Sequence, residues 1–216
     1  MNQFFKIGIV KTLWFNFAKL PFKQALRLPV ILARNVTVID CRRGCFEFDR
    51  AVTGCVTIGL NRCGNKGAPS SIRFYGKVII RGVRCHAFGA GCHISVARNA
   101  VFEIGDGFGC TGDITISVAK SMVIGADNLW SYNCAVMDND GHMILHDEGK
   151  VINLPRGVVF GDHVWMGNGC IILKGAEIAD GCIIAAGSRI AKKVADKDCI
   201  ITSDGKVLKQ NISWKR

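Results

Sequence analysis

Bulky apolar residues recur every six positions in the last third of the chain. Between residues 160 and 194 this spacing is kept by Phe160, Met166, Ile172, Ile178, Ile184 and Ile190. Four positions after each lie the compact residues Val164, Cys170, Ala176, Cys182, Ser188 and Val194. An α-helix repeats near 3.6 residues and a simple strand repeats every two, so neither explains the pattern. A period of six predicts short strands joined by turns and stacked into a parallel β-helix.

The same pattern is looser upstream and is interrupted twice. Strand-sized apolar pieces separated by glycine follow one another from residue 36, where NVTVID alternates. Residues 61–71 are polar and rich in glycine, which predicts a loop pushed out of the stack. Between Val136 and Phe160 the run DNDGHMILHDEGKVINLPRG breaks the count of six. Long loops on a rigid scaffold are where function concentrates, so this second interruption is the candidate site.

We therefore expect an all-β chain in three parts. Residues 36–199 form the β-helix with an inserted loop at 138–158, and residues 200–216 form a basic tail. Residues 1–35 mix aromatic residues and leucines with lysines and arginines, and prolines divide them into short helical pieces. This composition suits a basic amphipathic segment in peripheral contact with an anionic membrane. The alternative, which is compatible with it, is a cap over the open end of the β-helix or a subunit contact.

The net charge and the cysteines restrict which binding partners we expect for the protein and in which cellular compartment we expect it. The formal charge of +11 favours anionic partners, but no recognition motif accompanies it, so we expect no nucleic acid. Eleven cysteines without a signal peptide predict reduced thiols in the cytoplasm, with no metal. Adjacent pairs such as Cys85-His86 and Cys92-His93 would point to opposite faces of a strand and bind zinc poorly together. No apolar run is long enough to span a membrane.

The candidate chemistry lies at Asp138-Asn139-Asp140-Gly141-His142, where the second interruption begins. A carboxylate that accepts from one imidazole nitrogen leaves the other nitrogen as a base near neutral pH. The plainer interpretation is a polar turn whose aspartates accept from local backbone amides. The position at a break between regular coils favours the catalytic interpretation.

Residues from about 36 to 194 resemble the hexapeptide-repeat acyltransferases. Within that family, LWSYNCAVMDNDGHMI followed by FGDHVWMGNGCIILKGAEIADGCIIAAGSRIAKKV is similar to the sugar O-acetyltransferases of capsule and lipopolysaccharide synthesis. The resemblance implies a left-handed parallel β-helix that forms a homotrimer with active sites between subunits. It also implies acetyl-coenzyme A as co-substrate and a sugar or glycan as acceptor, in a cytoplasmic enzyme that is expected at the inner face of the membrane if residues 1–35 bind lipid.

The resemblance also assigns roles to individual residues. His142 matches the catalytic base, Asp140 or Asp138 would orient it, and Ser131 and Asn133 would lie near the same cleft. The residues that match the coenzyme groove are Trp165, Gly167, Asn168, Ala186, Gly187, Ser188, Lys192 and Lys193. Asn168 would line the pantetheine arm and Lys192 would meet the phosphates, with Lys215 and Arg216 as further cations from the tail. The chain departs from the family pattern at Met166, Ala185 and Ala191, which replace Ile, Gly and Thr.

Three other functions remain open from the sequence. The same fold acetylates amines in nucleotide amino-sugars or xenobiotics, and the acceptor atom cannot be read from these residues. A zinc lyase of the β-helical carbonic anhydrase type needs three converging histidines, and the five histidines here do not have that spacing. A non-catalytic binding or scaffold protein would lack coenzyme A binding, which the groove motif argues against.

Overall fold

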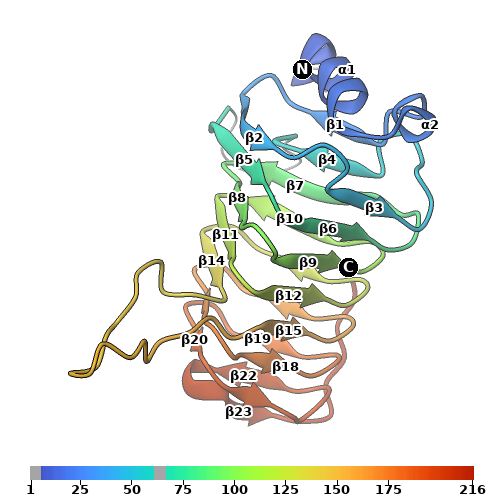
Figure 1. Cartoon of the computed structure of the whole chain (residues 1–216). Coiled ribbons are helices and arrows are strands. Elements are labelled where there is room, and N and C mark those ends of the chain that lie inside the picture. The colour runs from blue at the N-terminus through green and yellow to red at the C-terminus, as the bar shows by residue number, and fades with distance from the viewer. Residues whose placement is uncertain (1–5, 61–66) are drawn as a thin grey trace.

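The chain winds into a left-handed parallel β-helix built from three sheets (Figure 1). The computed structural model describes residues 6–60 and 67–216. Each coil contributes one strand to each sheet in turn, and the strands stack in parallel along the axis. Two short helices, α1 (Ile9–Lys19) and α2 (Phe22–Ala25), lie at the N-terminal end. The predicted fold class is therefore confirmed.

The sheets are named here in the order in which a coil visits them. Sheet I contains β1 (Val30–Leu32), β4 (Val56–Ile58), β7 (His86–Ala90), β10 (Gly109–Gly112), β13 (Leu129–Trp130), β16 (Trp165–Met166), β19 (Ile183–Ile184), β22 (Ile200–Thr202) and β23 (Lys206–Lys209). Sheet II contains β2 (Val36–Cys41), β5 (Ser70–Phe74), β8 (His93–Val96), β11 (Ile114–Val118), β14 (Cys134–Met137), β17 (Ile171–Ile172) and β20 (Arg189–Ile190). Sheet III contains β3 (Phe46–Phe48), β6 (Lys77–Ile80), β9 (Val101–Ile104), β12 (Ser121–Ile124), β15 (Val158–Phe160), β18 (Glu177–Ile178) and β21 (Lys193–Val194). The 3-10 turn η2 (Ser203–Gly205) joins β22 to β23.

The core is the inside of the coils, where the residues of the six-residue pattern are buried. Met166, Ile172 and Ile184 are each 0% exposed. The compact position between them is also inside, and burial raises the pKa of the Cys182 thiol to about 12. A thiol held neutral in this way packs as a small apolar side chain. The cysteines of the described residues are all free thiols.

The length of each coil shows where the inserted loop leaves the β-helix. Ile172 pairs with Ile190, 18 positions later, which equals three hexapeptides. Val136 pairs with Ile172, 36 positions later, so that coil is longer than its neighbour by 18 residues. Residues 139–156 account for this excess, because Val136 and Phe160 would be six positions apart if Asp138 were joined to Gly157. The loop is thus an insertion into an otherwise regular hexapeptide.

The ends of the β-helix differ from the boundaries expected from the sequence. Strand β1 already belongs to sheet I and pairs with β4, so the β-helix begins at Val30 and not at residue 36. At the other end β22 continues sheet I in parallel, and β23 closes it as an antiparallel strand. The expected loop at 61–71 lies partly outside the described residues, and its last two positions belong to β5. None of the described helices has the length and apolarity to cross a bilayer.

Candidate active site

The inserted loop is a narrow antiparallel hairpin that projects from the side of the β-helix (Figure 1). An isolated bridge joins Leu145 to Val151. The amide of Ile152 also donates to the carbonyl of Ile144 at 2.9 Å. Backbone pairing of this kind satisfies polar groups within the loop itself. The two limbs therefore support each other beyond the surface of the coils.

Asn153 ties the two limbs together beside the candidate base. Its Nδ2 donates to the carbonyl oxygen of His142 and to Asp140 Oδ2, at 2.8 Å in both cases. Its Oδ1 accepts from the amide of Ile144 at 2.7 Å. One side chain thus fixes the backbone on both sides of Met143 and leaves the imidazole of His142 free.

Lys174, from the next coil, anchors this arrangement to the scaffold. Its ammonium forms an ion pair with Asp140 and donates to the carbonyl oxygen of Asn153 at 3.2 Å. The Lys174 side chain is only 17% exposed. The hydrogen bond from Lys174, with a second from Asn153, holds the pKa of the Asp140 carboxyl below its usual value. Asp140 is therefore a charged structural link between the loop and the coil beneath it.

Asp138 has a different role from the one expected. Its carboxylate is 0% exposed and accepts from the backbone amides of Ala119, Lys120 and Ser121 at 2.7, 2.7 and 2.8 Å. A buried carboxylate needs such donors, because an unpaired buried charge is strongly unfavourable. Asp138 thus stabilises the turn of the preceding coil, which is the plainer interpretation that the sequence left open.

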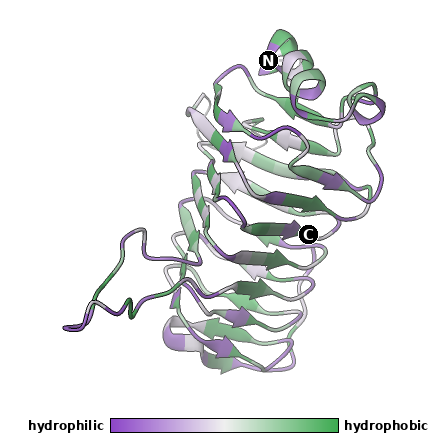
Figure 2. Ribbon diagram, viewed as in Figure 1, coloured by the Kyte–Doolittle hydropathy of each residue, from purple (hydrophilic) through white to green (hydrophobic). Residues whose placement is uncertain are grey.

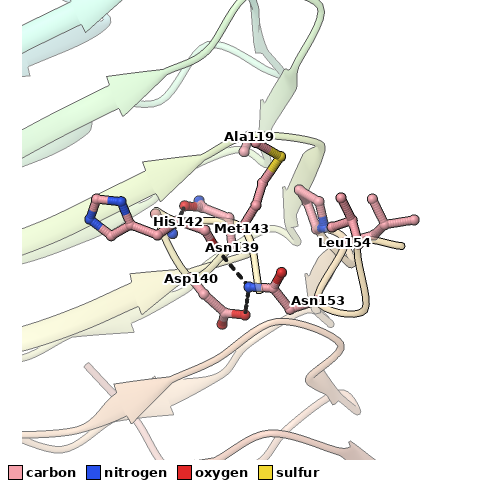
Figure 3. Close-up of a pocket in the computed structure, with 10 residues that line it drawn as sticks. Ala119, Asn139, Asp140, His142, Met143, Asn153 and Leu154 are labelled. Atoms are coloured by element: carbon pink, nitrogen blue, oxygen red, sulfur yellow. Dashed lines mark hydrogen bonds between the residues drawn. The ribbon is translucent and has the colours of Figure 1, made fainter. Parts of the chain in front are cut away.

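The His142 imidazole lies on the exposed surface of the loop. Figure 3 shows the ring pointing away from Asp140 and Asn153, and His142 is one of the residues that line an open pocket of about 280 Å³ between the loop and Ala119. Among the described residues neither Asp138 nor Asp140 hydrogen bonds to the ring. The expectation that one of them orients the imidazole is therefore not met within this chain, because both carboxylates are occupied by other donors.

The glycine-rich part of the expected coenzyme groove forms one column at the corner between sheets I and II. Gly167 and Asn168 follow β16, and Ala186 and Gly187 follow β19 one coil further on. The amide of Gly187 donates to the carbonyl of Asn168 at 2.8 Å. A Cβ on Gly167 would lie 2.7 Å from the backbone nitrogen of Ala186, so this close stacking requires glycine.

Ser188, which follows Gly187, is buried, unlike the exposed residues of the glycine column. Its side chain is 1% exposed and points into the β-helix, where its Oγ has no hydrogen-bond partner. The residue occupies the compact inward position of its hexapeptide. At this turn Ala186 and Gly187 are exposed, whereas the Ser188 side chain is not accessible to a ligand in this position.

The two expected phosphate-binding lysines lie at the other edge of sheet II. Both are exposed: Lys192 lies between β20 and β21, at the same corner as Lys174, and Lys193 is the first residue of β21. Lys193 forms an ion pair of 2.7 Å with Glu177 on the neighbouring strand. Lys192 has no ion pair among the residues that the structure describes. The candidate groove residues thus fall on both edges of one sheet, with the strands of sheet II between them.

Trp165 lies on the outer face of sheet I, where the C-terminal tail reaches it. Its side chain is 38% exposed, and its ring lies 6.0 Å from that of Trp214. Trp214 in turn stacks on His163 at 3.9 Å, with the rings 7° from parallel. Beyond it, Arg216 donates to the carbonyl oxygens of Gly107 and Asn128 at 2.7 Å. The tail therefore runs back along the coils, and the guanidinium of Arg216 is hydrogen bonded to their backbone.

Ser131 and Asn133 lie with the glycine column and not with His142. They precede β14, whereas the loop follows that strand. The amide of Gly169, one coil below, donates to the carbonyl of Tyr132 at 3.2 Å and places this turn directly above the glycine column. Within one chain these two residues are therefore separated from the candidate base by the width of sheet II.

The remaining histidine and cysteine pairs do not form a metal site. His86 is buried and its Nδ1 lies 3.1 Å from the carbonyl oxygen of Cys55, while His93 is exposed and bonded to Ser71. No group of three or more His, Cys, Asp or Glu side chains suited to a metal ion occurs in the described part of the chain.

Sequence reasoning missed Asn153, Lys174 and Trp214. Asn153 lies fourteen residues from Asn139 in a stretch without periodicity, and Lys174 occupies an ordinary turn position of its hexapeptide. Their contacts depend on how the hairpin folds back across the next coil. The aromatic character of Trp214 in a polar tail was the one signal that could have indicated a packed C-terminus.

Comparison with known proteins agrees with the repeat architecture. Residues 157–192 match the family described as bacterial transferase hexapeptide, six repeats. These residues are hexapeptide repeats of the bacterial transferase type, and the match confirms the family resemblance over this segment.

Particular relatives come from both sequence and structure. The chain is 35% identical over 65 residues to a polysialic acid O-acetyltransferase of Neisseria meningitidis. That match covers 30% of each chain, so most of the relative's length is unmatched. Among solved structures, the polySia-specific acetyltransferase NeuO matches at 21% identity with a TM-score of 0.46, over 84% of this chain and 89% of NeuO. The N-acyltransferase AntD of Bacillus cereus matches at 14% identity with a TM-score of 0.42, over 84% of this chain and 81% of AntD.

Proposed function

We propose that the chain is an acetyl-coenzyme A-dependent O-acetyltransferase that modifies a sugar of a surface polysaccharide or its precursor. The observation that carries the proposal is the exposed imidazole of His142 on a braced 18-residue insertion between regular hexapeptide coils. A rigid scaffold with one side chain presented on a supported loop is how binding and catalytic residues are commonly positioned. The hexapeptide transferase match and the polysialic acid O-acetyltransferase relative support the same class.

In the proposed reaction His142 acts as the general base. An unprotonated ring nitrogen takes the proton from an acceptor hydroxyl as its oxygen attacks the thioester carbonyl carbon. The carbon–sulfur bond then breaks, and the imidazolium returns the proton to the departing thiolate of coenzyme A. Asp140, Asn153 and Lys174 serve as positioning residues, since they hold the backbone that carries the imidazole.

The coenzyme would lie along the outside of the lower coils. Gly167, Asn168, Ala186 and Gly187 present backbone and small side chains, which lets an extended molecule approach closely. Trp165 lies on the face next to this column, and Lys192 offers an unpaired ammonium to a phosphate group. Free thiols buried inside the coils fit a reducing cytoplasm, where we place the reaction.

The complete site would require more than one subunit. The loop exposes Met143, Ile144, Leu145, Ile152 and Leu154 by 53–75%, which is unusual for apolar side chains that stay in water. Within one chain His142 and the glycine column lie at opposite edges of sheet II. We infer a homotrimer in which the loop of one subunit covers the groove of the next.

The decisive test compares His142→Ala with His146→Ala. Both histidines are exposed on the same loop, so neither change removes a packed side chain. We expect His142→Ala to lower kcat by about 10²–10⁴-fold while coenzyme A binding is unchanged, and His146→Ala to be neutral. Release of coenzyme A over a panel of sugars with free hydroxyls or amines gives the rate and the acceptor class. Full activity in His142→Ala would reject the assignment, and a lack of coenzyme A binding in the wild type would favour a non-catalytic protein.

Hybrid trimers test the shared site. His142→Ala removes the base, and Ala186→Trp places a bulky side chain at an exposed position of the groove. If the site lies between subunits, mixing the two inactive variants restores part of the activity, because some interfaces combine an intact loop with an intact groove. If activity stays absent after subunit exchange, each site belongs to a single chain.

A further inference from the structure

Helix α1 turns its polar side inward and its apolar side outward. On the inner side Thr12 Oγ1 accepts from the amide of Leu32 at 3.0 Å. Asn16 Nδ2 donates to the carbonyl of Val30 at 2.7 Å, and Phe15, on the same side of the helix, is 0% exposed. These contacts fix α1 on the first strand of the β-helix, so its orientation is defined by buried hydrogen bonds.

The opposite side of α1 is apolar throughout. Ile9, Val10, Leu13, Trp14 and Phe17 are exposed by 42–82%. At about 100° per residue these five positions fill one arc of roughly 140° that no other residue of the helix enters. A helix on the surface of a protein normally turns such an arc toward the core. The arrangement here is the reverse, and it calls for an apolar partner outside the chain.

Helix α2 extends this surface. Phe22 is 66% exposed and Leu26 is 60% exposed, and the Phe22 ring lies 6.3 Å from that of Phe17. We refer to Ile9, Val10, Leu13, Trp14, Phe17, Phe22 and Leu26 as the cap face. Figure 2 shows the apolar colouring of α1 at the end of the β-helix. Seven exposed apolar side chains on two adjacent helices exceed the scattered single residues that ordinary surfaces carry.

The segment that carries the cap face is rich in cations and contains no acid, and Asp40 on β2 is an acid that interacts with Lys19. Residues 1–39 contain Lys6, Lys11, Lys19, Lys23, Arg27 and Arg34 but no aspartate or glutamate. The Lys19 ammonium lies 5.6 Å from the centre of the Trp14 ring. Lys23 is exposed on α2 next to Phe22, and Arg27 is exposed just after this helix, next to Leu26. The surface thus combines apolar anchors with a basic rim, which is the composition of segments that lie in the interface of anionic bilayers.

We propose that the cap face docks the protein on an anionic phospholipid bilayer, with α1 lying in the plane of the headgroups. A second copy of this chain is a poorer occupant, because two cap faces would bring together the six cations of residues 6–34, which outnumber an acid such as Asp40 near Lys19. Insertion across the bilayer is excluded for α1, whose 11 residues are far too short. The inserted loop leaves the side of the β-helix at a distance from α1 (Figure 1), so docking leaves it uncovered.

Binding of the full-length protein to vesicles tests the proposal. We expect co-sedimentation with vesicles of phosphatidylcholine and phosphatidylglycerol, weak binding to phosphatidylcholine alone, and loss of binding as salt increases. The double variant Leu13→Ser and Phe17→Ser should lower the partition coefficient at least about tenfold, since both side chains would enter the apolar layer. Leu208→Ser is the matched control, because Leu208 is 58% exposed on β23 at the other end of the β-helix.

Charge reversal separates the basic rim from the apolar face. Lys23→Glu with Arg27→Glu should weaken binding to the anionic vesicles and leave the low affinity for phosphatidylcholine unchanged. Equal vesicle binding by wild type and the Leu13→Ser and Phe17→Ser variant would overturn the proposal. So would an absence of vesicle binding together with a smaller particle for that variant in light scattering, because a second copy would then be what covers the cap face.

Discussion

The regular coils of residues 157–194 and the inserted loop of residues 139–156 place their apolar side chains in opposite ways. In the coils two positions in every six, one bulky and one compact, are inside, and the large apolar side chains left outside, Val159, Trp165 and Ile171, are 38–39% exposed. In the loop Met143 and Leu154 are 75% and 66% exposed. The coils gain stability from burial within the chain, whereas the loop holds its shape through Asn153 and Lys174 and exposes its apolar side chains. Under the proposed function, stability and chemistry would therefore be carried by separable parts of the chain.

Removing the loop should give the largest effect. Deletion of residues 139–156 joins Asp138 to Gly157 and restores a six-residue spacing from Val136 to Phe160. We expect acetyl transfer to fall to the background rate, because His142 is gone, while the far-ultraviolet circular dichroism and the cooperative melting of the β-helix persist. A variant that no longer folds would show that the loop is part of the scaffold. It would contradict the conclusion that the coils are stable without the loop.

Truncation of one inward residue should mainly affect stability. Ile172 is 0% exposed and Ile171, its neighbour, is 39% exposed on the outer face. Ile172→Ala should lower the free energy of unfolding by about 2–5 kcal/mol, because it leaves a cavity inside the coil. Ile171→Ala is the matched control, with an expected loss of less than half as much. Denaturant titration measures both, and similar losses would mean that burial inside the coils is not the main source of stability.

Two aspartates that are two residues apart should respond differently. Asp138→Ala removes a buried acceptor from three backbone amides, and we expect a loss of about 2–4 kcal/mol in the free energy of unfolding. Asp140→Ala removes an exposed link to Lys174, so thermal stability should hardly change while kcat falls. The opposite result in melting and rate measurements would return Asp138 to the catalytic role expected from the sequence.

The hydrogen bonds made by the Asn153 side chain should make a moderate contribution to kcat. Asn153→Ala removes the hydrogen bonds to His142 O, Asp140 and Ile144, so the imidazole would sample more positions. We expect kcat to fall about tenfold with the KM for acetyl-coenzyme A unchanged, since the groove lies elsewhere. Asp147→Ala, at the exposed tip of the same loop, is the control. A rise in KM without a fall in kcat would show that Asn153 serves substrate binding instead.

The sequence predicts the structure where a local pattern repeats. It fails to predict the role of a side chain that depends on one contact with a residue far away in the chain. The six-residue period from Phe160 to Ile190 predicts a parallel β-helix, because few other folds have that period, and the structure shows its three sheets. The break in the period predicts a loop at residues 138–158, and the strand register limits the insertion to residues 139–156. The roles of the side chains within it depend on contacts between residues far apart in sequence, such as Asp138 with Lys120 and Asp140 with Lys174. No local pattern encodes which of two aspartates will be buried, so the sequence left that choice open.

The smallest expected effect is a change in the acid titration of Asp140. Lys174, with help from Asn153, holds the pKa of this carboxyl below its usual 3.8. A group with a lowered pKa in the folded protein stabilises the fold above its unfolded pKa, and this contribution is lost as the pH falls through the folded value. Lys174→Met should therefore raise the pKa of Asp140 toward 3.8 and bring the acid-induced loosening of the loop to higher pH. Carbon-13 NMR of the carboxyl group measures this, and Lys193→Met, which removes the partner of Glu177, should leave the Asp140 pKa where it was. An Asp140 pKa that does not respond to Lys174→Met would mean that the loop is held to the coils by contacts other than this ion pair.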